Sequence, residues 1–219
     1  MRLALFDLDN TLLDGDSDVV WGELLAAEGA MDVERTRRFH DDYHAGTLDI
    51  DAFLRFQLEP LAREPLERLL AWRAVFLGEL IRPRLGRAAR ALVRDHERRG
   101  HELVLITATN AFLAEPIADE LAIPHVIATR PASVDGRFTG GVEGTPCFRE
   151  GKIENLERWL AARGACFAEV EESWFYSDSH NDLPLLGLVD HPVAVDPDRT
   201  LAARARERGW PVLRLRANV

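Results

Sequence analysis

The chain has 219 residues, more than a typical single domain of about 150, so a core with one insertion is expected. Its 47% hydrophobic residues suffice for a buried core, and its net charge of −10 weighs against nucleic acid as a partner. No run approaches the length of a membrane span, and Asp7 interrupts the first apolar stretch, so we expect neither membrane association nor a signal peptide.

Two further features of composition bear on location and partners. Cys147 and Cys166 form neither a disulfide framework nor a metal-binding spacing, which suits a reducing compartment and predicts a cytoplasmic protein. Two Arg-rich segments, around residues 35–38 and 94–99, are interleaved with acids. We therefore predict that both are solvent-exposed helical faces and not sites for a phosphate backbone.

The first predicted element is a buried parallel strand, Leu3–Phe6, followed at once by Asp7 and Asp9. A turn after Asp7 would release the two side chains from the alternation of an extended strand, so that they point in different directions. One carboxylate would then be free to attack a substrate while the other handles its proton. Asp, Asn and Thr are also common in turns, so this segment alone equally fits a structural turn.

Between Gly15 and about Leu80 the pattern contains no convincing strand. Apolar residues recur instead at helical spacing. Breakers divide the stretch into short helices; they are Gly29, Gly46, Pro60 and Pro65. This part of the chain is predicted to be a helical insertion.

The rest of the chain alternates between strands and helices, which predicts an α/β fold with a parallel sheet. The predicted helices cover residues 85–99, 111–121, 152–164 and 183–189. The predicted strands cover residues 103–106, 126–128, 174–176, 193–195 and 212–215, with a small hairpin within 132–146.

Polar groups stand at the ends of these strands or the starts of the helices. They are Thr107–Asn110, Lys152, Asp178 and Asp182. In an open α/β sheet such positions gather in the crevice beyond the carboxyl ends of the strands. Taken singly, Thr107–Asn110 fits simple helix capping and Lys152 fits an exposed surface lysine.

Four short motifs stand in order along the chain: Asp7-x-Asp9-x-Thr11, Thr107, Lys152 and Asp178-x-x-x-Asp182. Together they resemble the haloacid dehalogenase superfamily of aspartate-nucleophile hydrolases, in the branch that contains phosphoserine phosphatase. Ser177 departs from the pattern, because many relatives have glycine there. The resemblance implies a Rossmann-like parallel sheet core of residues 1–14 and 81–219, with an all-helical cap domain of residues 15–80.

The resemblance also implies an activity, namely Mg²⁺-dependent hydrolysis of a phosphomonoester through an aspartyl-phosphate. It assigns nucleophilic attack to Asp7 and the acid–base role to Asp9. It places Mg²⁺ between the carboxylates of Asp7 and Asp178 and the backbone carbonyl of Asp9.

Further residues receive supporting roles from the same resemblance. Those expected to bind phosphate are Thr107, Ala108, Thr109 and Lys152. Asp182 is expected to orient Lys152 or a metal-bound water, and Asn181 to cap the following helix while lining the site. His180 has no ligand partner at a suitable spacing, so we do not expect it to be a direct catalyst.

The expected substrate is a small phosphorylated metabolite, a phosphorylated amino acid or a related amine such as histidinol phosphate. Asp16 stands where this branch carries an acid that faces a substrate amine, but it also fits a cap for the first helix of the insertion. Three other activities stay open: a phospho-accepting signalling module, a dehalogenase and a phosphotransferase or phosphomutase. Asp9 argues against a signalling module, because an acid at this position supplies fast dephosphorylation. It also argues against a dehalogenase, because dehalogenation has no need of this acid. The sequence does not determine the oligomeric state.

Overall fold

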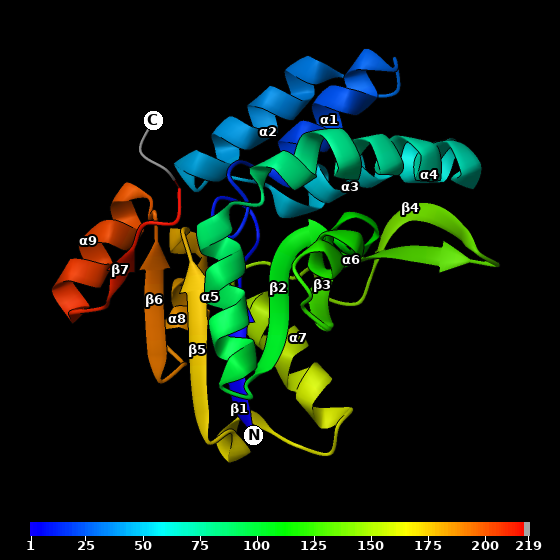
Figure 1. Cartoon of the computed structure of the whole chain (residues 1–219). Coiled ribbons are helices and arrows are strands. Elements are labelled where there is room, and N and C mark those ends of the chain that lie inside the picture. Colours follow the sequence, from blue (N-terminus) through cyan, green and yellow to red (C-terminus); the bar gives the residue numbers. More distant parts are fainter. Residues whose placement is uncertain (217–219) are drawn as a thin grey trace.

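The computed structural model describes residues 1–216, apart from the side chains of Val33, His40 and His44. Seven strands form one sheet in the order β4-β3-β2-β1-β5-β6-β7 (Figure 1). All neighbouring strands are parallel except β3 and β4, which are antiparallel. The strands are β1 Arg2–Phe6, β2 Glu102–Asn110, β3 His125–Val134, β4 Arg137–Glu143, β5 Glu172–Ser177, β6 His191–Val195 and β7 Val212–Leu213. The predicted α/β fold is confirmed.

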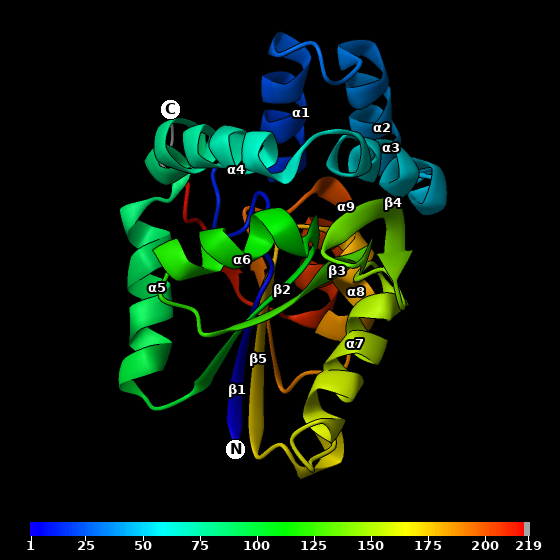
Figure 2. The same ribbon diagram turned by 90° about the vertical axis from the view of Figure 1, so that its right-hand side faces the viewer.

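Helices cover both faces of the sheet, as the side view in Figure 2 shows. Alternate residues of a strand point to opposite faces of the sheet. Because helices cover both faces, successive residues of the central strands are apolar. Ala4 and Phe6 of β1 belong to one core cluster with the helices α5 (Arg87–Arg98) and α6 (Ala111–Glu120). Leu3 and Leu5 belong to a second cluster on the other face. The helices of that face are α7 (Glu150–Ala161), α8 (Leu183–Leu186) and α9 (Arg199–Arg208).

The segment between β1 and α5 is helical, as predicted, and lies over the carboxyl ends of the strands (Figure 1). It comprises α1 Ser17–Ala27, α2 Val33–Ala45, α3 Ile50–Arg63, α4 Leu66–Val75, a π-helical stretch Phe76–Ile81 and a 3₁₀ turn Arg82–Arg84. Asp16, Asp32 and Asp49 cap the first three helices by accepting backbone N–H groups. The division of the chain into a core domain and a cap domain stays a prediction.

Several predicted boundaries were wrong. Pro60 lies inside α3 and does not break it. Pro60 lies in the last turn of α3 and is buried. Proline removes one backbone hydrogen bond from a helix, and the packing of the buried Pro60 side chain offsets that loss here. The helix expected at 183–189 begins at Leu183 as predicted but ends early, at Leu186, and a separate 3₁₀ turn, His180–Asp182, precedes it. β7 ends at Leu213, since the next backbone N–H groups, of Leu215 and Arg216, turn to the carboxylate of Asp196.

The predicted hairpin exists and is larger than expected. β3 continues past the predicted strand at 126–128, turns at Asp135–Gly136 and returns as β4. β4 reaches up to the helical insertion, where Gly140 packs on α3 so closely that a Cβ added there would lie 3.4 Å from Cβ of Ala62. The hairpin therefore supports one side of the insertion.

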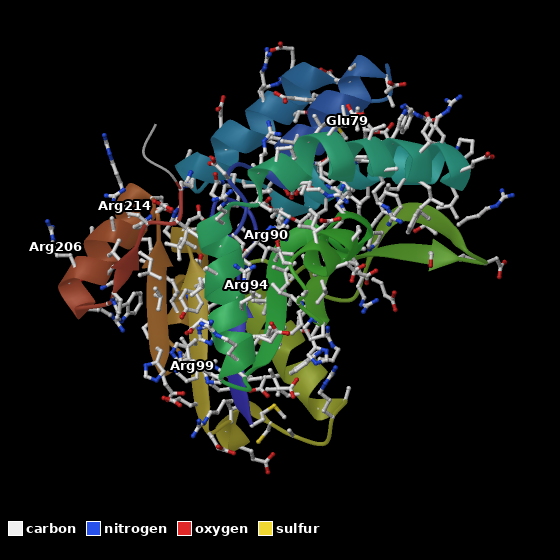
Figure 3. The ribbon with its side chains drawn as sticks, viewed as in Figure 1. Glu79, Arg90, Arg94, Arg99, Arg206 and Arg214 are labelled. Carbon is white, nitrogen blue, oxygen red and sulfur yellow. The ribbon has the colours of Figure 1, made fainter. Side chains whose placement is uncertain are left out.

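The two Arg-rich segments lie on the surface, as predicted. Both Arg-rich segments are exposed on or next to helices; Figure 3 shows Arg94 on α5 and Arg99 directly after its last residue. Arg37 pairs with Glu34 at 3.0 Å and Arg98 pairs with Asp95 at 2.9 Å, so the interleaved acids neutralise part of each face. Within residues 1–216 the search for an apolar helix long enough to cross a bilayer found none.

Candidate active site

The loop that follows β1 carries the first two acids. The backbone N–H of Asp7 still bonds to the carbonyl of Tyr176 on β5, at 2.9 Å. The chain then turns sharply: Asn10 has φ of 57°, and the N–H groups of residues 11–13 all reach the carbonyl of Leu8. As a result Asp7 remains anchored to the sheet while Asp9 takes partners of its own.

Asp7 is buried, with 7% of its surface exposed, and it contacts a buried cation. Lys152 Nζ, at the start of α7, donates to Asp7 Oδ1 at 2.8 Å and to Asp182 Oδ2 at 2.7 Å. Burial raises the pKa of Asp7 to about 7, against the opposing effect of Lys152. Burial alone would lower the pKa of Lys152, but the attraction of Asp182 and Asp7 outweighs it and raises that pKa. Lys152 is therefore charged.

The burial of Lys152, at 3% exposure, rules out the surface interpretation. Its backbone lies in the first turn of α7, where a cation opposes the helix dipole, so its charge is held by the two acids and not by the helix. Composition offers a signal for this role: Lys152 is the only lysine among the 27 Lys and Arg residues. An ammonium is a compact point charge, which fits between two carboxylates better than the wide fork of an arginine.

Asp9 is held by groups from two other elements. Its Oδ2 accepts from Thr109 Oγ1 at 2.6 Å, and its Oδ1 accepts from the backbone N–H of Ser17 at 2.6 Å. Burial, followed by repulsion from Asp16, raises the pKa of Asp9 to about 7. A carboxyl group with a pKa near neutrality is suited to giving and taking a proton.

Thr11 joins the loop after β1 to the loop after β5, a role that the sequence did not reveal. Its hydroxyl accepts from the backbone N–H of Asp178 at 2.9 Å. The same hydroxyl lies 3.1 Å from Asp178 Oδ1 and 3.3 Å from Asp7 Oδ2, and it donates to one of them at a time. Burial, and then repulsion from Asp7 and Asp182, raise the pKa of Asp178 well above its ordinary value.

The predicted phosphate-binding segment lies at the end of β2. Thr107, Ala108 and Thr109 are still extended, and α6 begins only at Ala111, so the expected helix N-terminus is a few residues further on. The N–H of Thr109 bonds to Thr107 Oγ1 at 3.2 Å. Asn110 is the residue before α6, and no side-chain bond caps that helix. The capping interpretation of this segment is therefore wrong.

The loop after β5 gives Ser177 a clear role and shows that the capping role expected for Asn181 was wrong. Asp182 Oδ2 accepts from Ser177 Oγ at 2.7 Å as well as from Lys152, so serine at 177 adds a bond that glycine would lack. Asn181 does not cap α8. Ser179 caps the 3₁₀ turn instead, by accepting from the N–H of Asn181 at 3.2 Å. The side chain of Asn181 turns to Arg149, whose Nε donates to its Oδ1 at 2.9 Å.

His180 lies apart from these acids. Its Nδ1 is 2.7 Å from Asp198 Oδ2, at the start of α9. It does not line the cavity that lies over Asp7 and Asp9. The structure thus brings together Asp7, Asp9, Lys152, Asp178 and Asp182 and leaves His180 outside.

A cavity lies over Asp7 and Asp9, between the sheet and the helical insertion. Its lining from the sheet side includes Asp7, Asp9, Thr107, Ala108, Thr109, Lys152 and Asp182. Its lining from the insertion includes Asp16, Asp18, Thr36, Phe39, Tyr43, Phe53 and Gln57. Asp178 and Asn181 are not part of this lining.

Asp16 performs the structural role that its sequence context allowed. Its Oδ1 accepts from the N–H of Val19 at 3.0 Å, so it caps α1, and it also lines the cavity. A contact with a substrate amine stays a prediction. Asp18 and Gln57 were not among the predicted site residues.

Three contacts hold the insertion over the cavity. Tyr43 Oη on α2 donates to Ser179 Oγ at 3.1 Å, and Arg149 Nη2 donates to the carbonyl of Gly46 at 3.2 Å. On the other side, Arg73 Nη1 donates to the carbonyl of Phe112 at 2.9 Å. Apart from Ser179, which lies inside the fourth motif at one of its unspecified positions, the residues in these contacts come from segments without the four motifs, which is why the sequence did not single them out.

Comparison with known proteins agrees with this geometry. The family model of the haloacid dehalogenase-like hydrolases matches residues 4–187. Histidinol-phosphatase of Neisseria meningitidis serogroup C (strain 8013) is 46% identical over 217 residues, which cover 97% of this chain and 98% of that protein.

Two solved structures show the same fold. A protein of unknown function from Bordetella pertussis Tohama I has a TM-score of 0.92 and 44% identity, and the match covers 98% of this chain and 99% of that one. A substrate-bound phosphoserine phosphatase complex has a TM-score of 0.70 and 19% identity, over 96% and 91% of the two chains. The chain therefore belongs to the haloacid dehalogenase-like hydrolases, and its relatives place it among the phosphatases of that family.

Proposed function

We propose that the protein hydrolyses a small phosphomonoester through an aspartyl-phosphate on Asp7, with Mg²⁺ as cofactor. The observation that supports this best is the position of Asp7, which lines the cavity, is held by Lys152 at 2.8 Å and has a second acid, Asp9, on the same loop. One carboxylate positioned by a cation and one with a pKa near 7 are the two groups that the chemistry needs.

In the first step a carboxylate oxygen of Asp7 forms a bond to phosphorus while the bond from phosphorus to the substrate alcohol breaks. Asp9 donates a proton to the departing oxygen. In the second step Asp9 takes a proton from a water molecule, which attacks phosphorus and releases Asp7. Lys152 favours the ionised form of Asp7 that attacks phosphorus, and Thr109 Oγ1 donates to Asp9 at 2.6 Å.

The residues around Asp7 fit a hard divalent cation. Within residues 1–216 no group of three His, Cys, Asp or Glu side chains is arranged to hold a metal ion. The ligands that the resemblance implies are two carboxylates, those of Asp7 and Asp178, and the backbone carbonyl of Asp9; the hydroxyl of Thr11 lies 3.3 Å from the first carboxylate and 3.1 Å from the second. The repulsion that raises the pKa of Asp178 would be offset by a cation between it and Asp7. Oxygen ligands favour Mg²⁺, which would neutralise charge on the phosphate.

The proposed substrate is a small phosphorylated amine, with histidinol phosphate as the leading candidate. The name of the relative that is 46% identical supports this choice. The acid Asp16 on the wall of the cavity supports it too, because a carboxylate can bind the substrate ammonium.

The test is a phosphatase assay with purified protein on an aryl phosphate and on histidinol phosphate, with Mg²⁺ and with excess chelator. We expect turnover of both with Mg²⁺, loss on chelation and recovery when Mg²⁺ is restored. Full activity in excess chelator would contradict the metal assignment. Absence of turnover on a broad panel of phosphate esters would contradict the phosphatase itself.

A further inference from the structure

Two buried acceptor oxygens in the cavity have no hydrogen-bond partner. They are Asp18 Oδ1 on α1 and Gln57 Oε1 on α3. Gln57 is only 3% exposed, so water does not reach it freely. A buried acceptor without a donor destabilises the folded protein, because it has lost its hydrogen bonds to water and gained none in return. Of the three such acceptors in the described chain, these two belong to residues that line the cavity, so donors on a ligand there would remove the cost.

The charge of the cavity restricts which ligand can supply those donors. Asp16 and Asp18 line its upper part, and burial together with their mutual repulsion raises the pKa of Asp18. Among the described lining residues Lys152 is the only Lys or Arg, and its ammonium already binds Asp7 and Asp182. A leaving group with a carboxylate would thus meet acids and no uncommitted cation on this lining, whereas an ammonium would meet two carboxylates.

The shape of the wall beside Gln57 adds a second restriction. Phe53 and Gln57 stand four residues apart on α3, so they share a face of the helix. Phe39 of α2 also lines the cavity, and its ring centroid is 5.5 Å from that of Phe53. Aromatic faces favour flat and cationic groups, and the free oxygen of Gln57 favours an N–H at the edge of such a group.

We propose that Asp18 and Gln57 form a specificity subsite for a cationic leaving group that carries both an ammonium and a planar ring with an N–H. Asp18, together with Asp16, binds the ammonium, and Gln57 accepts from the ring beside Phe39 and Phe53. The imidazole and amine of histidinol phosphate have this chemistry, and phosphoserine does not. The proposal rests on the proposed function only for the placement of the phosphate end over Asp7.

The kinetic test compares kcat/KM on histidinol phosphate with kcat/KM on an aryl phosphate, which has neither group. Asp18→Asn should lower this ratio by roughly 10- to 100-fold, because it removes a charge-assisted contact. Gln57→Leu should lower it by about two- to tenfold, the loss of a neutral hydrogen bond. The matched control is Asp14→Asn, which changes an exposed acid in the loop before α1 and should keep the wild-type ratio.

A binding test separates this subsite from the phosphatase chemistry. Calorimetry with histidinol and with serine, the two alcohols without phosphate, measures recognition of the leaving group alone. We expect wild type to bind histidinol more tightly than serine, and Asp18→Asn and Gln57→Leu to weaken histidinol by the factors given above. Unchanged histidinol affinity in both folded variants, or tighter binding of serine than of histidinol by wild type, overturns the subsite. Failure of wild type to hydrolyse any phosphate ester would instead overturn the proposed function.

Discussion

On the floor of the cavity the carboxylates of Asp7, Asp9 and Asp182 all have partners within the chain, supplied by Lys152, Thr109 and Ser177. On its roof Asp18 and Gln57 each present a buried oxygen without one. A group whose partners are internal is already positioned before a substrate arrives, which suits chemistry common to every phosphate ester. A group whose partner is missing gains one only when the right ligand binds, which suits selection of the leaving group.

The largest effect should follow from removing the proposed nucleophile on the floor. Asp7→Asn replaces a carboxylate with an amide of the same shape, so we expect phosphatase activity with Mg²⁺ to fall to background. The assay is the rate on an aryl phosphate, with folding checked by circular dichroism and Asp14→Asn as the matched exposed control. A variant that kept most of its rate would rule out the aspartyl-phosphate.

The second acid on the same loop should matter less. Asp9→Asn leaves Asp7 and Lys152 in place but removes the proton donor, a loss of roughly 10²–10⁴ in kcat. A leaving group of low pKa needs little protonation, so the loss in the first step should shrink for activated aryl phosphates. Rapid-quench kinetics across aryl phosphates of graded leaving-group pKa would measure this trend. A loss independent of the leaving group would argue against the acid role.

A third change tests whether the floor depends on its internal partners for stability. Lys152→Met leaves Asp7 and Asp182 buried without their cation, and breaking a buried pair in this way costs roughly 3–5 kcal/mol. Urea denaturation would measure the free energy of unfolding, with Arg94→Met, which changes an exposed cation, as the control. Adding Asp182→Asn should restore part of the loss; no recovery would mean that the two charges are not coupled.

The roof should respond in the opposite direction. Gln57→Leu removes a buried oxygen that lacks a partner, so we expect the free energy of unfolding without ligand to rise by about 1 kcal/mol. For a chain of this size that corresponds to an increase in Tm of roughly 2–4 °C. Differential scanning calorimetry measures it. A clear loss of stability would mean that Gln57 is structurally required and that floor and roof do not differ in the way inferred above.

The smallest effect concerns a partnered polar cluster away from the cavity. His96 Nδ1 lies 2.7 Å from His101 Nδ1, and its Nε2 lies 2.8 Å from Tyr176 Oη. Burial and repulsion from His101 and Arg99 lower the pKa of His96 to about 4. Below about pH 6.5 the imidazole of His96 takes up a proton in the unfolded chain but stays neutral in the folded chain until about pH 4. The contribution of His96 to the free energy of unfolding is therefore complete above pH 6.5 and decreases as the pH falls toward 4.

Urea denaturation between pH 7.5 and pH 4.5 would measure that slope, and His96→Gln should flatten it because the side chain no longer titrates. An unchanged slope in this variant would assign the pH dependence to other groups, such as the buried acids of the floor.

The sequence alone was enough to predict the α/β fold and the helical insertion, because both depend on local patterns: apolar runs for parallel strands and helical spacing between Gly15 and Leu80. It also indicated the polar residues of the four motifs, since each motif stands at a strand end or a helix start. Boundaries were less secure where tertiary contacts outweigh local preference, as at Pro60 inside α3 and at Asp196, which ends β7.

Only the tertiary structure decided which polar groups find partners. Thr11 reaches Asp178 across 167 residues of chain, and Lys152 reaches Asp7 across 145. Asp18 and Gln57 are ordinary helix residues in the sequence, and nothing local distinguishes them. They become a candidate subsite because folding places them in the cavity with Asp7 and Asp9, each with one buried oxygen that has no donor. Hydrogen-bond satisfaction depends on which distant segments meet, and local sequence does not encode it.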